Sequence, residues 1–102
     1  MIVEILAIDE CGNADAALDR VRVAFDRVGR GDVPVEIRWI RTRADAASTP
    51  FAGSPTIAVD GVDLFPSDGR TIDLACRVYS TPNGLAGLPT VDQIIDRLDV
   101  VA

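Results

Sequence analysis

The sequence from Phe51 to Phe65 reads FAGSPTIAVDGVDLF and decides the fold. Two short apolar runs within it flank Asp60-Gly61, a dipeptide that is typical of the tight turn of a β-hairpin. Pro55 lacks the backbone N–H that the interior of a strand needs, so it belongs at the entrance of the first strand. The stretch therefore predicts a hairpin that begins at Pro55.

The chain before this hairpin predicts a β-α-β unit. Residues 2–8 are almost entirely apolar and predict a buried strand. Apolar residues at spacings of three and four then predict a helix over residues 14–28, with Asn13 as its N-cap. Residues 33–39 alternate between apolar and polar, and Pro34 within them favours an edge strand. The two strands are expected to be parallel, with a right-handed crossover.

The rest of the chain predicts two further helices and a long connection. Thr42 is expected to cap a short helix over residues 43–47, and Thr90 with Gln93 forms the capping-box pattern of a closing helix. Residues 66–89 are rich in Gly and Pro and exceed an ordinary connection in length, which is often a sign of function. At 102 residues, the whole chain (1–102) is expected to form a single domain.

Composition excludes several classes of function. The net charge is −6, all ten cationic side chains are arginine, and histidine is absent. An acidic chain of this kind is not expected to bind nucleic acid, and it lacks the usual general base and the commonest metal ligand. Apolar runs stay well below the roughly 20 residues of a membrane span. The first residues do not have the pattern of a signal peptide, so we expect a cytoplasmic protein.

The two cysteines are the candidates for chemistry. Cys11 and Cys76 are too few for the four thiolates of a structural zinc site, and we expect neither a metal nor another cofactor. As small apolar side chains, both could equally be packed in the core. Cys11 is expected at an exposed helix start and Cys76 within an apolar run, so we expect Cys11 to be the more reactive thiol.

Three placements give the chain a family resemblance. Cys11 follows the first strand and opens the first helix, Ser54-Pro55-Thr56 opens the third strand, and Asp60-Gly61 turns the hairpin. This layout resembles that of thioredoxin-like proteins, and in particular small bacterial members, some of which are loosely grouped with organomercurial lyases. The resemblance implies an α/β fold of order βαβ-α-ββα, with a four-stranded mixed sheet, a central first strand and an extra loop before the last helix.

The resemblance also implies a site. It makes the Ser54–Pro55 bond cis and places it opposite Cys11, with the backbone at Ser54, Pro55 and Thr56 available to bind an extended substrate. Redox members of the family carry Cys-x-x-Cys, whereas here Cys11 is followed by Gly-Asn-Ala, so the usual second cysteine is missing. We therefore expect a thiol-disulfide oxidoreductase that works through Cys11 alone or with Cys76, on a small thiol or a protein disulfide.

Two other functions stay open. Two thiolates could bind a soft metal ion or an organomercurial, because soft ligands select soft ions. A binding module that kept the fold and lost the chemistry is equally compatible with the pattern. The loop over residues 66–89 is relevant to the choice among these functions. We expect it to fold over the site and bring the Cα atoms of Cys11 and Cys76 within about 7 Å.

Overall fold

The computed structural model describes residues 1–66 and 73–101. Its elements, in chain order, are β1 (Val3–Ala7), α1 (Ala14–Arg27), β2 (Val35–Trp39), α2 (Arg43–Ala47), β3 (Thr56–Val59), β4 (Val62–Asp63), β5 (Tyr79–Thr81), β6 (Gly84–Ala86) and α3 (Val91–Val101). Four of the strands form one mixed sheet in the order β2-β1-β3-β4, so β1 is central, as expected. The predicted α/β class and the four-stranded mixed sheet are confirmed.

The sheet combines a parallel and an antiparallel half. β1 pairs in parallel with β2, which is an edge strand as Pro34 suggested, and antiparallel with β3. β3 then turns into β4 through Asp60 and Gly61, whose φ angles of 51° and 79° are those of the expected primed turn. β4 is shorter than the apolar run that predicted it, because only Val62 and Asp63 pair with β3.

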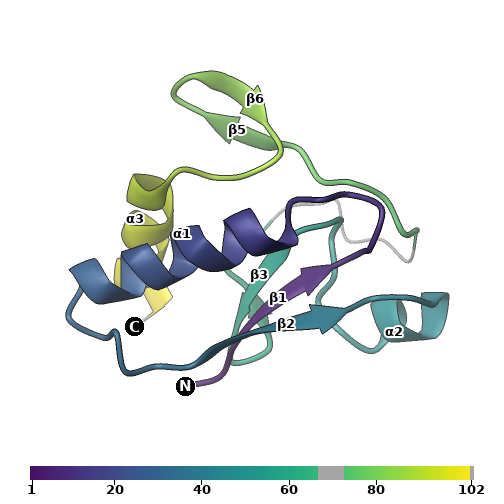
Figure 1. The fold of residues 1–102 in the computed structure, drawn as a ribbon, viewed down its shortest axis with the longest axis horizontal. Coiled ribbons are helices and arrows are strands. Elements are labelled where there is room, and N and C mark those ends of the chain that lie inside the picture. The colour runs from purple at the N-terminus through teal and green to yellow at the C-terminus, as the bar shows by residue number, and fades with distance from the viewer. Residues whose placement is uncertain (67–72, 102) are drawn as a thin grey trace.

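Helices cover the two faces of the sheet unequally. In Figure 1, α1 and α3 lie together on one side of the sheet, and α2 lies past the C-terminal end of β2. Alternate residues of β1 serve the two faces, with Ile5 in the larger apolar core beneath α1 and α3 and Leu6 in a smaller one. The smaller cluster is the part of the core that lies next to the candidate site. Its buried members are Leu6, Ile8, Ile40, Ala46, Phe51 and Ala58.

The helix caps follow the sequence with one exception. Thr42 and Asp45 exchange side-chain-to-backbone bonds of 3.0 and 3.2 Å in a full capping box at the start of α2. Thr90 and Gln93 do the same before α3, at 2.9 and 3.1 Å. Asn13 occupies the predicted N-cap position of α1, but its side chain makes no capping hydrogen bond.

The long connection contains structure that the sequence did not predict. β5 and β6 pair as a second, two-stranded sheet, which lies above α1 and α3 in Figure 1. The part of the expected loop at residues 67–72 lies outside the described residues. Among the described residues, no helix combines the length and the apolar character needed to cross a lipid bilayer.

Candidate functional site

The two cysteines form a disulfide. Their Cα atoms are 5.8 Å apart although 65 positions separate them in sequence, so the expected approach of Cys76 to Cys11 is confirmed. Cys11 lies in the turn after β1, half-buried against the smaller cluster. Cys76 lies on an exposed part of the chain, so the expectation that Cys11 would be the more exposed of the two is wrong.

Ser54 lies at the centre of the site. Its bond to Pro55 is cis, as the resemblance implied, and both residues are buried. The side-chain hydroxyl accepts a hydrogen bond of 3.0 Å from the backbone N–H of Ile8, at the end of β1. This bond ties the start of the hairpin to the strand that leads into Cys11.

The chain itself pairs with Ser54. The N–H of Ser54 donates to the carbonyl of Ala75 at 2.8 Å, and the N–H of Arg77 donates to the carbonyl of Ser54 at 2.8 Å. Ser54 and Cys76 thereby form a parallel β-bridge. We call residues Ala75–Tyr79 the docked segment, because they lie beside Ser54 as an additional strand would.

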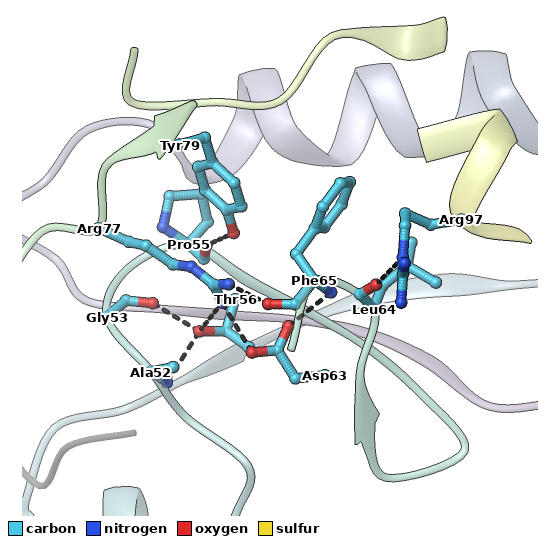
Figure 2. A network of polar contacts seen from close by, with 10 residues as sticks. All are labelled: Ala52, Gly53, Pro55, Thr56, Asp63, Leu64, Phe65, Arg77, Tyr79 and Arg97. Carbon is cyan, nitrogen blue, oxygen red and sulfur yellow. Dashed lines mark hydrogen bonds and ion pairs between the residues drawn. The ribbon is translucent and has the colours of Figure 1, made fainter. Parts of the chain in front are cut away.

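Arg77 anchors the docked segment to the hairpin. Its guanidinium group donates to the carboxylate of Asp63 at 2.9 Å and to Thr56 Oγ1 at 3.4 Å, and it also donates to the carbonyl of Phe65. Figure 2 shows these bonds running from the guanidinium group of Arg77 to Asp63, Thr56 and Phe65. The side chains of Arg77 and Asp63 are only 8% and 13% exposed, so this ion pair is largely shielded from water.

The charge of Asp63 is balanced by opposing effects. Burial raises the pKa of its carboxyl, while the hydrogen bond from the Phe65 N–H and the charge of Arg77 act against the rise. Removing Arg77 alone would leave Asp63 buried without its cationic partner. Such a change destabilises a fold more than removing both charges of the pair does. The network is therefore a specific attachment between the docked segment and β4.

Tyr79 supplies a second anchor. Its hydroxyl donates to the carbonyl of Pro55, and its ring lies edge-on to Phe65 with centroids 5.5 Å apart (Figure 2). The guanidinium carbon of Arg77 lies 4.6 Å from the centroid of the same ring. Burial raises the pKa of the Tyr79 phenol well above its ordinary value, since the phenolate would lose its hydration there.

Gly53 and Thr56 complete the surroundings of Pro55. Thr56 Oγ1 donates to the Gly53 carbonyl at 2.6 Å and accepts from the Ala52 N–H at 3.0 Å, which fixes the bend before β3. Gly53 has a φ of 103°, and a Cβ placed there would lie 2.9 Å from Cβ of Arg77. A glycine is therefore required for the docked segment to approach this closely.

The charges near Cys11 partly cancel. Asp9 pairs with Arg41 at 3.1 Å, which reduces one of the negative charges that would oppose a Cys11 thiolate. The first turn of α1 adds the carboxylate of Asp15 together with the favourable end of the helix dipole. Among the described residues, no group of three or more His, Cys, Asp or Glu side chains could hold a metal ion.

The structure brings together all five residues that the sequence singled out: Cys11, Ser54, Pro55, Thr56 and Cys76. Sequence reasoning missed Gly53, Asp63, Arg77 and Tyr79. The available signal was weak, although an arginine and the only tyrosine of the chain flank an apolar residue directly after Cys76.

Three comparisons, with models of known protein families, with curated proteins and with solved structures, found no significant match to this chain. A proposal for the function therefore rests on the residues of the site and their geometry.

Proposed function

We propose that the chain is a thioredoxin-like thiol protein in which Cys11 and Cys76 cycle between a disulfide and two thiols. The observation that carries the proposal is the 5.8 Å separation of the two Cα atoms, across 65 positions of sequence. The element order, with a central β1 followed by α1 and with the β3–β4 hairpin opening at Pro55, supports the family assignment.

In this proposal Cys11 is the nucleophile and Cys76 the resolving thiol. A substrate disulfide is attacked by the Cys11 thiolate, and the mixed disulfide that forms is then attacked by Cys76. The second thiolate of the substrate leaves, and the protein ends as the Cys11–Cys76 disulfide. Cys76 thus takes the part that the second cysteine of Cys-x-x-Cys has in redox members of the family.

Equilibration in glutathione redox buffers tests the exchange. The oxidised protein should have no thiol that titrates with a thiol reagent, and the fully reduced protein should have two. The conversion should be reversible, and on a non-reducing gel the oxidised form should migrate faster as a monomer. The variants Cys11→Ser and Cys76→Ser should each lose the fast band. A band that persists in either variant, or a disulfide that only links two chains, would contradict the proposal.

A second candidate function is binding of a soft metal ion or an organomercurial by the reduced pair. The close approach of the two cysteines favours it, since two thiolates are then available to one ion. Tight binding of one Hg(II) per reduced protein, without exchange in glutathione buffers, would support this function. A protein that shows neither exchange nor binding would instead be a module that retains the fold without the chemistry.

A further inference from the structure

The position beside Ser54 is already filled by the chain. Ser54 is fully buried, its N–H is bonded to Ala75, and its carbonyl is bonded to Arg77. An extended polypeptide that approached Cys11 by pairing with this backbone would have to displace the docked segment. What determines access is therefore how the docked segment is held.

Besides the disulfide, several other contacts hold the docked segment in place. The two backbone bonds lie on either side of Cys76, and the buried Arg77–Asp63 pair follows immediately. The Tyr79 hydroxyl then bonds to Pro55, and its ring lies against Phe65. These contacts involve backbone groups, a guanidinium and a phenol, whose bonding does not depend on the oxidation state of sulfur.

We propose that the docked segment remains on Ser54 when the disulfide is reduced, so that the cysteine pair exchanges with low-molecular-weight thiols and disulfides and gains no rate from pairing with an extended polypeptide. This inference rests on the proposed function for its chemistry. Arg77 is a positioning residue in it: through its ion pair with Asp63 it keeps Cys76 beside Cys11.

The exchange reduces the Cys11–Cys76 disulfide at the expense of two small thiols. A small thiolate attacks Sγ of Cys11, and the electron pair of the broken bond leaves with Cys76, which lies on the more exposed side of the disulfide. A second small thiolate attacks the sulfur that the first one brought, and Cys11 leaves as a thiolate. Two small thiols are thereby oxidised to one disulfide, and their protons end on Cys11 and Cys76. The N-terminal end of α1, which is the positive end of the helix dipole, stabilises the departing Cys11 thiolate.

The first test compares two probes on the Cys76→Ser variant, in which Cys11 is the only thiol. The probes are N-acetylcysteine and an extended cysteine-containing peptide, each as its mixed disulfide with thionitrobenzoate, so that the leaving group is the same. We expect the peptide to react no faster than N-acetylcysteine. A peptide that is clearly faster in this variant would show that Ser54 is open to it and would overturn the proposal.

Releasing the docked segment should change this result. Adding Arg77→Gln together with Asp63→Asn removes both charges of the buried pair and leaves neither unpaired. The peptide should then react about tenfold faster relative to the small probe, the size expected from one or two strand hydrogen bonds. The matched control is Arg20→Gln, which removes a bond of 2.8 Å from Arg20 to the Pro89 carbonyl. An unchanged ratio after release would contradict the role of Arg77.

The second test does not depend on exchange. Tyr79 is the only tyrosine of the chain, so the absorbance of tyrosinate at 295 nm reports on the docked segment alone. In the double variant Cys11→Ser/Cys76→Ser, Tyr79 should resist ionisation as strongly as in the oxidised protein. Ionisation near the ordinary value of about 10 while the fold is intact would mean that docking needs the disulfide, and the proposal would fail. If neither probe reacts with Cys11, the proposed function fails, and this titration still decides whether the segment docks.

Discussion

At the scale of single residues, Gly53 limits how closely the docked segment can approach the hairpin. Gly53 and Gly84 share a φ of 103°, but a Cβ at Gly84 would meet open space, whereas one at Gly53 would lie 2.9 Å from Cβ of Arg77. The two positions therefore share this φ angle and differ in crowding. This pair of glycines allows strain in φ to be separated from displacement of Arg77.

We predict that Gly53→Ala destabilises the protein more than Gly84→Ala does, by about 1–3 kcal/mol. The excess arises because Arg77 must move away from a new Cβ, and its bond to Asp63 is weakened with it. The free energy of unfolding of both variants, measured in urea, checks the prediction. Equal losses in the two variants would show that the crowding at Gly53 is relieved without cost.

At the scale of secondary-structure elements, the features that depend on residues close in sequence could be predicted best. Capping boxes need residues only three positions apart, so both Thr42 with Asp45 and Thr90 with Gln93 could be recognised from sequence. The Asp60-Gly61 turn is local in the same way. Asn13 takes the predicted N-cap position without a side-chain capping bond, because a capping residue type does not ensure that its side chain turns toward the helix.

The elements that could not be predicted depend on distant partners. β5 and β6 have three residues each and expose Leu85, so they lack the apolar alternation that reveals a strand. The roles of Arg77 and Asp63 depend on a contact between two segments that are separate in sequence. The approach of Cys76 could be expected from the missing second cysteine, but the pairing of its neighbours with Ser54 could not.

The capping box of α3 should contribute to the stability of the whole domain, because Ile94 and Leu98 of that helix are buried in the larger core. We expect Thr90→Ala to lower the free energy of unfolding by about 1 kcal/mol, since the N–H of Gln93 loses its acceptor. Urea denaturation measures the change. Thr90→Ser is the matched control, because it keeps the hydroxyl, and it should lose much less; an equal loss would assign the effect to packing of the methyl group.

The capping box of α2 should be sensitive to acid. The N–H of Arg41 bonds to Asp45 and is the largest cause that lowers the pKa of this carboxyl. A lowered pKa in the folded state means that the contribution to stability is present above the unfolded pKa and is lost as pH falls through the folded one. We expect the protection factors of the α2 amides, which are corrected for the intrinsic exchange rate, to fall in that range, with Asp45→Asn showing a weaker dependence on pH. The same dependence in Asp45→Asn would exclude this carboxyl as the cause.

At the scale of the whole molecule, the disulfide and the main core are separate sources of stability. The larger core contains neither cysteine and is built from β1, β2, β3, α1, α3 and their connections. The disulfide instead closes a loop that spans most of the chain, from Cys11 to Cys76. Its main thermodynamic effect is expected in the unfolded chain, where the crosslink restricts the accessible conformations.

We therefore predict that reduction weakens the fold without abolishing it. For a loop of this length, chain entropy gives a loss of roughly 4 kcal/mol in the free energy of unfolding. The reduced protein should also show a steeper dependence on urea, because an unfolded chain without a crosslink exposes more surface. Urea titrations with and without a phosphine reductant measure both quantities, with Cys11→Ser/Cys76→Ser as the control that the reductant should leave unchanged. A reduced protein that is unfolded in the absence of urea would mean that the core does not fold without the crosslink. Unchanged stability would mean that the unfolded chain is already compact when reduced.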